Sequence, residues 1–256
     1  MAEQKVQEPI KKVAVAAQKA VRAESEPAPV RTYRALLFRG ALVLTAIAFG
    51  ILTFLVKTTP AFAIDLQITR AIQSLNFSLF GTLMSLVSWF GFVPQSMVIA
   101  GLLILLIFGF GLRWEAVITL ISTVLSTTIN LLVKDLIQRP RPASGQITVF
   151  DTLNSYSFPS GHVMFYIGLF GFIGFLAFSL LKPSFKRGLL LVIFGSLVAL
   201  IGISRIYLGE HWASDVLGSY LLGSLLLVAI IQIYLWGKTR FFVHQPVAAA
   251  AAPQKK

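Results

Sequence analysis

Six long apolar runs restrict how this chain can fold more than any other feature of its sequence. They cover residues 35–56, 94–112, 116–132, 162–181, 188–204 and 213–237. A helix needs about 20 mostly apolar residues to cross the hydrocarbon core of a bilayer. Charged residues make up only 12% of the 256 residues, whereas about 25% is usual in soluble domains. The sequence therefore predicts an all-α integral membrane protein with six transmembrane helices in one bundle.

Residues 64–90, between the first two runs, have a different pattern. Their apolar side chains recur at intervals of three and four residues, at Ile68, Ile72, Leu75, Leu79, Leu83, Leu86 and Phe90. Polar side chains such as Asp65, Arg70 and Asn76 occupy other faces. This spacing predicts an amphipathic helix, or two, lying at the membrane interface beside the bundle. A seventh span is the alternative, which the polar N-terminal half of the stretch disfavours.

The two ends of the chain lack the apolar character of its middle. Residues 1–33 are polar and of mixed charge, and residues 241–256 are rich in Ala and Pro. We expect both to be disordered tails around a membrane domain at 34–240. In the first tail, Ile10, Val13, Ala17 and Val21 have helical spacing with basic residues between them. A basic helix lying on anionic lipid is therefore the alternative there.

The positions of the cations predict the orientation of the chain. A net charge of +12 would suit nucleic acid, but most Lys and Arg residues flank apolar runs, which indicates membrane topology and no nucleic-acid partner. With a cytoplasmic N-terminus, six spans return the C-terminus to the cytoplasm. That side then holds Arg31, Arg34, Arg39, Arg113, Lys182, Lys186, Arg187, Lys238 and Arg240. The outer side holds Lys57, Arg70 and Arg139, apart from cations in polar motifs. We therefore expect both termini in the cytoplasm.

Three polar motifs interrupt the apolar sequence, all at predicted outer ends of helices. The last is Ser204-Arg205-(five residues)-His211-(three residues)-Asp215. The spacing of four places His211 and Asp215 on one helix face, where the carboxylate can fix the ring tautomer and leave the other nitrogen free. A short turn at Gly209 brings Arg205 near, and its planar guanidinium suits phosphoryl oxygens. The blander alternatives are a helix-start histidine beside a dipole-favoured aspartate and an arginine that reaches the membrane surface.

The middle motif is Pro159-Ser160-Gly161-His162, at the start of the fourth predicted span. Proline is tolerated at a helix start, Ser160 can cap the helix, and Gly161 lets a ligand approach the backbone. Free N–H groups and the positive end of the helix dipole form a cradle for an anion. His162 above that cradle suits a general acid. An ordinary capped helix with a solvated histidine is the alternative.

The first motif, Lys134-(six residues)-Arg141-Pro142, closes the third predicted span. Arg139-Pro140 lies two residues earlier, but the spacing of six favours Arg141 as the functional arginine. An unpaired ammonium at the centre of a bilayer costs roughly 2.5–3.5 kcal/mol and less near the surface. Lys134 is therefore either a ligand for an anion or a side chain that reaches the interface.

The order of the three motifs and their common side resemble the type 2 phosphatidic acid phosphatase family. These lipid phosphatases share a core with vanadium haloperoxidases. The motifs cover residues 134–215, the helix layout covers most of 35–236, and every key position matches. The resemblance implies a membrane phosphatase domain at 34–240 that needs no metal and no cofactor. Cysteine is absent, which also excludes a thiolate metal site.

The resemblance implies a role for each matching residue. His211 is the nucleophile that forms a phosphohistidine, and Asp215 orients it. His162 protonates the leaving lipid oxygen and then activates water. The phosphate oxygens are held by Lys134, Arg141, Ser160, Gly161 and Arg205, which together with backbone N–H groups replace a metal in stabilising charge.

We therefore expect an integral-membrane phosphatase that acts on a lipid phosphate at the outer face (periplasmic, extracellular or lumenal). The candidate substrates are phosphatidic acid, phosphatidylglycerol phosphate, and a polyprenyl phosphate or diphosphate such as undecaprenyl diphosphate. A non-catalytic lipid-phosphate binding or transport protein is the alternative, although both motif histidines are intact. A vanadate-dependent haloperoxidase is a further alternative, which the lipid-facing bundle disfavours.

Overall fold

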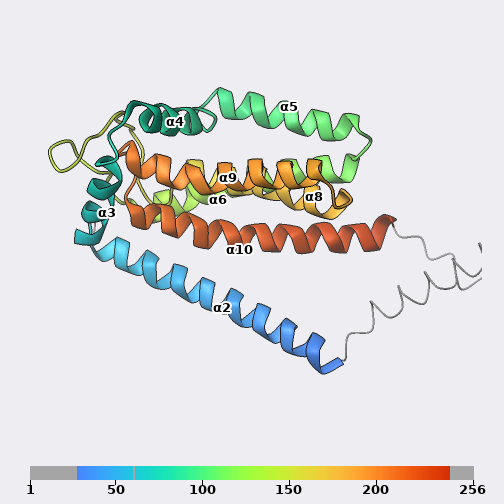
Figure 1. Cartoon of the computed structure of the whole chain (residues 1–256). Helices are drawn as coiled ribbons and strands as arrows, with labels where there is room; N and C mark the ends of the chain where they lie inside the picture. Colours follow the sequence, from blue (N-terminus) through green and yellow to red (C-terminus); the bar gives the residue numbers. More distant parts are fainter. Residues whose placement is uncertain (1–27, 60, 243–256) are drawn as a thin grey trace, which may run out of the picture. The chain divides into compact units, whose positions relative to one another are not determined.

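The computed structural model describes residues 28–59 and 61–242, and every regular element in those ranges is helical (Figure 1). In chain order the helices are α2 (Ala28–Thr58), α3 (Ala63–Gln73), α4 (Ser78–Trp89), α5 (Gln95–Gly109), α6 (Arg113–Ile137), α7 (Gly161–Tyr166), the π-helix η1 (Ile167–Gly171), α8 (Phe172–Leu180), α9 (Phe185–Tyr207), α10 (Ala213–Gly237) and the π-helix η2 (Lys238–Phe242). The predicted all-α class is confirmed. Most of the two predicted tails lies outside the described residues.

The chain divides into two units, Met1–Thr45 and Ala46–Lys256. The first contains the N-terminal part of α2. The second contains the rest of α2 and every later helix, and the three motifs lie wholly within it.

Within residues 28–59 and 61–242, five helical stretches are long and apolar enough to cross a membrane. They are Thr32–Thr58, Arg113–Ile137, Gly161–Leu180, Phe185–Tyr207 and Ala213–Phe241. Each corresponds to one predicted span. The sixth predicted span, at 94–112, is α5, which has only 15 residues where about 20 are needed to cross the hydrocarbon core.

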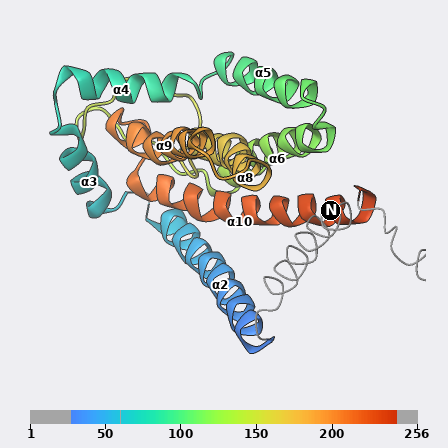
Figure 2. The ribbon, with the colours of Figure 1, turned by 45° about the vertical axis from the view of Figure 1, so that its right-hand side comes forward.

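The predicted amphipathic stretch is two helices, α3 and α4, bent by 119° at the break between them. Both lie at the end of the second unit where α9 ends and α10 begins (Figures 1 and 2). Two polar side chains of α3 point inward. Asp65 and Thr69 are buried, whereas Ile64 and Ile68 are 56% and 36% exposed. Helix α3 therefore directs Asp65 and Thr69 to the protein and leaves Ile64 and Ile68 on its surface.

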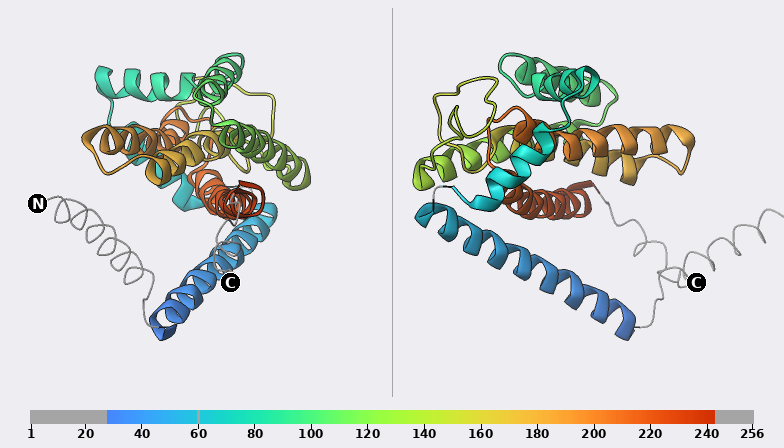
Figure 3. Two further views of the ribbon diagram at one scale, coloured as in Figure 1. Left: turned by 90° about the vertical axis from the view of Figure 1, so that its right-hand side faces the viewer. Right: turned by 60° about the vertical axis from the view of Figure 1, so that its left-hand side comes forward.

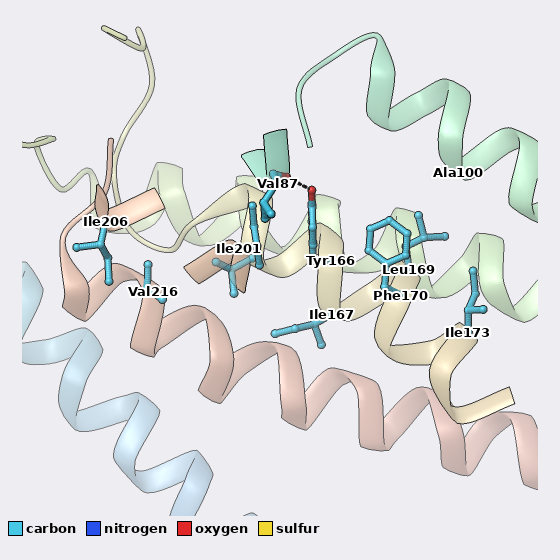
Figure 4. Packing of buried hydrophobic residues seen from close by; sticks show 11 residues of the cluster. Val87, Ala100, Tyr166, Ile167, Leu169, Phe170, Ile173, Ile201, Ile206 and Val216 are labelled. Carbon is cyan, nitrogen blue, oxygen red and sulfur yellow. Dashed lines mark hydrogen bonds between the residues drawn. The ribbon is translucent and has the colours of Figure 1, made fainter. Parts of the chain in front are cut away.

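The span that begins at Gly161 contains a π-helical turn, η1, in the middle of the core. The hydroxyl of Ser122 on α6 donates to the carbonyl of Gly168 at 2.6 Å. Tyr166 donates its hydroxyl proton to the carbonyl of Val87 on α4, and Ile167 and Phe170 pack into the same cluster (Figure 4). The π-helical turn and the residue before it are therefore hydrogen-bonded to α6 and α4.

Antiparallel packing brings the three motifs to one end of the second unit. Helices α6 and α9 end there, and α7 and α10 begin there, beside the loop at 138–160 (Figure 3). The predicted turn between α9 and α10 contains Gly209 with φ of +69°. A Cβ atom at this position would overlap the carbonyl oxygen of Thr148, so only glycine fits both the space and the left-handed backbone.

The close approach of α6 to η1 is testable at Gly168. A Cβ atom there would lie 2.6 Å from Ser126 Oγ and 3.0 Å from the carbonyl oxygen of Ser122. Because overpacking of a buried contact costs about 1–3 kcal/mol, we expect Gly168→Ala to lower the thermal unfolding temperature in detergent. Gly101→Ala on α5 is the matched control, since nothing lies within 4 Å of its added Cβ. Equal unfolding temperatures for both variants would contradict this packing.

Candidate active site

His211 lies just before α10, at the end of the second unit where the three motifs meet, and is buried. Its Nδ1 is 3.4 Å from Asp215 Oδ2, and its Nε2 is 3.3 Å from Arg141 Nη1. Burial lowers the pKa of His211 well below its ordinary value, and the positive charges of Arg141, Lys134 and Arg205 lower it further. The ring is therefore neutral at physiological pH. With its Nδ1 proton directed at Asp215, it keeps a lone pair on Nε2.

Asp215 is fixed from several directions at the start of α10. Its Oδ2 accepts the backbone N–H of Trp212 at 2.9 Å and the hydroxyl of Ser157. The Ser157 hydroxyl also lies 3.5 Å from His211 Nδ1. These contacts hold the carboxylate in the position that the predicted His–Asp pair requires. Ser157 belongs to no motif, and nothing in its sequence context distinguishes it from other loop serines.

Arg141 is anchored beside the imidazole by the backbone of two segments. Its Nη1 donates to the carbonyl of Glu210 at 2.5 Å, and its Nε donates to the carbonyl of Ser155 at 2.7 Å. Burial lowers the pKa of Arg141 to about 10, and the charge of Asp215 opposes that change. Arg141 therefore remains a cation at neutral pH, next to the Nε2 atom of His211.

Lys134 lies in the last turn of α6, and its side chain is buried beside the same loop. Its ammonium donates to the carbonyl of Tyr156 and, at 3.5 Å, to that of Ser157. A pocket of about 540 Å³ opens next to it, lined by Lys134, Arg141 and loop residues that include Asn154 and Tyr156. The pocket therefore leaves space for a polar ligand group beside the cations Lys134 and Arg141.

The structure corrects two details of the middle motif. Pro159 precedes the helix, and Ser160 occupies the N-cap position without making a side-chain cap bond. The N–H of Ser160 donates to Ser219 Oγ at 2.6 Å, so it is not a free donor for an anion. Gly161 approaches Asn130, whose Oδ1 would lie 3.2 Å from an added Cβ. The predicted backbone cradle is thus partly occupied by protein groups.

Two other polar atoms of this motif remain available. Ser160 Oγ and His162 Nε2 are buried and make no hydrogen bond within the described ranges. The His162 ring packs edge-on against Phe92, with centroids 4.6 Å apart. His162 interacts electrostatically with Arg205, His211, Arg141 and Lys134. The structure therefore places both histidines and the three motif cations in one electrostatic environment.

Arg205 is fully buried, but its partner was not predicted. Its Nη2 forms an ion pair with Glu210, its Nη1 donates to Ser88 Oγ, and the guanidinium lies over the Phe92 ring at 5.2 Å. We expected the guanidinium to lie near the imidazole and gave Glu210 no role. A glutamate directly before a motif histidine, in a turn otherwise apolar, was the available signal.

Arg139, which the spacing argument set aside in favour of Arg141, is also part of the site. Its Nη1 is 2.5 Å from Asp215 Oδ1, and its Nη2 is 2.9 Å from Asp65 Oδ2. Arg139 therefore contacts the aspartate, whereas Arg141 contacts the histidine. Sequence reasoning placed Asp65 on a polar face of the amphipathic stretch and gave it no role in the site.

The charges of the site come from side chains that do not form a metal-ligand set. Within the part of the chain that the structure describes, residues 28–59 and 61–242, no three or more His, Cys, Asp or Glu side chains form a group suited to a metal ion. The positive charge available to an anionic ligand is carried by Lys134, Arg141 and Arg205.

Comparison with known proteins agrees with the resemblance drawn from the motifs. Residues 115–238 match the family model of the PAP2 superfamily. Phosphatidylglycerophosphatase B of Bacillus subtilis (strain 168) is 35% identical over 114 residues, which are 44% of this chain and 55% of that protein. The chain thus spans about half the length of this curated relative.

Two solved structures share the fold. The crystal structure of a transmembrane PAP2 type phosphatidylglycerolphosphate phosphatase from Bacillus subtilis matches with a TM-score of 0.68 and 26% identity, covering 79% of this chain and 98% of that one. Aquifex aeolicus LpxE matches with a TM-score of 0.51 and 23% identity, covering 70% of this chain and 98% of that one. The predicted multi-pass membrane fold is confirmed.

The Arg205–Glu210 pair can be tested by anion binding. Glu210→Gln removes the carboxylate that competes with an anion for Arg205. We expect inorganic phosphate to bind about 10- to 100-fold more tightly, because one charge-assisted bond contributes roughly 1.5–3 kcal/mol. Titration calorimetry in detergent measures this change. The control is Glu115→Gln, which breaks the buried 2.6 Å pair with Lys238 at the opposite end of α6. Unchanged or weaker phosphate binding by Glu210→Gln would contradict the prediction.

Proposed function

Because residues 115–238 belong to the PAP2 superfamily, we propose that this chain is an integral-membrane phosphatase of lipid phosphates. The observation that carries the proposal is the state of His211. This imidazole is buried, with Asp215 at one nitrogen and the cation Arg141 at the other. A neutral ring with a free lone pair beside a fixed cation is suited to attack a phosphorus atom that the cation also holds.

The first half of the proposed reaction transfers the phosphoryl group to the protein. The phosphate oxygens bind Lys134, Arg141 and Arg205, with the Ser160 hydroxyl as a further donor. His211 Nε2 attacks phosphorus, and the bond from phosphorus to the lipid oxygen breaks. His162, which is protonated in the complex with the phosphate anion, gives its proton to that oxygen. Asp215 stabilises the positive charge that develops on the ring. The products of this half are the lipid alcohol, or a lipid monophosphate from a diphosphate, and a phosphohistidine.

The second half regenerates the protein with water. His162, deprotonated by the first half, takes a proton from a water molecule, which attacks phosphorus as the bond to His211 breaks. Inorganic phosphate leaves, and both histidines return to their starting protonation states. The cations stabilise the charge of the transferring group in both halves, so this reaction needs no metal ion.

The substrate we propose first is phosphatidylglycerol phosphate. Two matches support this choice. The curated relative with 35% sequence identity and the solved structure with a TM-score of 0.68 are both phosphatidylglycerol phosphate phosphatases from Bacillus subtilis. Phosphatidic acid and polyprenyl phosphates or diphosphates share the same chemistry, a phosphate on a long apolar chain. We place the proposed site on the outer face. Most Lys and Arg residues outside the motifs and the N-terminal tail lie at the opposite ends of the spans, and loops rich in Lys and Arg stay in the cytoplasm.

The nucleophile can be tested by phosphate release from a panel of these lipids, with purified protein in detergent and EDTA present. We expect His211→Ala to lose all turnover, because no other group replaces the attacking nitrogen. A ³²P-labelled substrate should leave an alkali-stable, acid-labile label on the parent protein and none on the variant.

His244→Ala is the matched control, since it removes the histidine that lies outside the motifs. Release of phosphate by His211→Ala at the parental rate would contradict the mechanism. Loss of the parent's activity in EDTA, restored by a metal ion, would contradict metal independence. Tight phosphate binding without turnover of any lipid would support a binding or transport protein.

The lowered pKa of His211 predicts the acid limb of the pH profile. Protonation of Nε2 removes the nucleophile, and the pKa lies well below the ordinary value of 6.5 because of burial and the neighbouring cations. We expect kcat/KM, corrected for the ionisation of the substrate by ³¹P NMR, to stay constant as the pH falls through 6.5 and to decrease only below it. Arg141→Gln removes one cation and should move the limb of the residual activity toward higher pH. A limb at or above 6.5 in the parent protein would contradict this prediction.

A further inference from the structure

We infer that Arg139 and Asp65 are positioning residues that hold Asp215, and through it His211, in the reactive geometry. This inference rests on the proposed function. Neither residue belongs to a motif, and neither contacts the atoms expected to react. Both are buried, with exposed fractions of 1%.

The contacts form a chain of alternating charge. Asp65 Oδ2 accepts from Arg139 Nη2 at 2.9 Å, and Arg139 Nη1 donates to Asp215 Oδ1 at 2.5 Å. The other carboxylate oxygen of Asp215 faces His211 Nδ1 at 3.4 Å. Arg139 therefore binds Asp215 Oδ1, whereas His211 faces Oδ2. The carboxylate cannot rotate without losing its contact with Arg139 or with His211.

Asp65 holds Arg139 and the start of α10 at the same time. Its Oδ1 accepts the backbone N–H of Ser214 at 2.8 Å, and its Oδ2 accepts the Ser214 hydroxyl at 2.6 Å. The Arg139 guanidinium is further sandwiched near the Phe62 and Trp212 rings, at 5.3 and 5.9 Å. Helix α3 thus fixes the position of the guanidinium relative to the residue next to Asp215.

Two arginines separated by one proline consequently hold the two ends of the His–Asp pair. Arg139 binds the far oxygen of Asp215, and Arg141 lies beside the far nitrogen of His211. The carbonyl of the intervening Pro140 accepts the indole N–H of Trp212 at 3.1 Å. A buried ion pair contributes little to stability compared with apolar packing, so the charges are better explained by orientation of Asp215 than by stability alone.

The first experiment separates chemistry from binding. We expect Arg139→Gln to lower kcat by about 10- to 100-fold, since small displacements of a catalytic group have effects of that size. KM and the Kd for inorganic phosphate should stay unchanged, because Arg139 does not contact the substrate. Arg139→Lys keeps the charge and should recover part of kcat, and Asp65→Asn should show an intermediate loss. The control is Arg70→Gln on α3. The Arg70 guanidinium donates to the Gln146 carbonyl, away from Asp215, so this variant should leave kcat unchanged.

A spectroscopic readout distinguishes positioning from a purely structural role. In ¹⁵N-histidine spectra of a His244→Gln background, with His162→Gln used for assignment, we expect the parent His211 to be the Nδ1–H tautomer. Arg139→Gln and Asp65→Asn should give a mixture of tautomers at unchanged far-UV circular dichroism. If Arg139→Gln does not fold, the same spectra can be recorded on two other variants, Arg139→Lys and the double variant Asp65→Asn/Arg139→Gln. The double variant neutralises both partners of the Arg139–Asp65 pair, so neither is left as an unpaired charge.

The outcomes are decisive in both directions. A tautomer that stays unchanged in all folded variants, or a rise in KM with constant kcat, would overturn the positioning role. The tautomer measurement requires no turnover. If the tautomer of His211 differs between the parent and the variants as expected, but the parent forms no phosphohistidine, the proposed function is contradicted. The inference that Arg139 and Asp65 position His211 would still stand.

Discussion

Pairing of buried charge is the constraint on which this site depends. A lone ion costs several kcal/mol when it leaves water, so charges at the end of an apolar bundle must neutralise one another or bind donors and acceptors with good geometry. The chain does both. Asp65, Arg139 and Asp215 alternate in sign, Arg205 meets Glu210, and the ammonium of Lys134 is received by loop carbonyls. The result is a set of cations held in place before any substrate arrives.

Fixed charges of this kind are suited to stabilise the transition state of phosphoryl transfer. The charge of the transferring group changes little in total but moves between oxygens, and preorganised donors need no reorganisation as it moves. Burial has a second consequence for His211, since it keeps the imidazole neutral among cations. The same desolvation thus strengthens the interaction of the cations with an anion and preserves the lone pair on His211 Nε2.

Much of the architecture could be predicted from sequence, because apolar length and motif spacing are local properties. Five predicted spans correspond to long helices, and the short turn predicted at Gly209 is present, with a left-handed backbone at that glycine. The missed features are tertiary. Asp65 is 74 residues from Arg139 in the chain, and no periodicity reveals that Asp65 on α3 points inward. The occupation of the Ser160 N–H by Ser219 likewise depends on how α7 meets α10. Spacing selected Arg141, which lies beside His211, but could not show what Arg139 contacts.

The inward direction of Asp65 on α3 has a consequence for where the functional unit begins. Sequence similarity to the PAP2 superfamily starts at residue 115, yet Asp65, 50 residues earlier by position number, completes the surroundings of Arg139. The boundary of the recognisable family segment is therefore not the boundary of an autonomous catalytic module. Grafting residues 115–238 onto a foreign N-terminal half would transplant every motif residue and still leave one carboxylate of the charge chain behind.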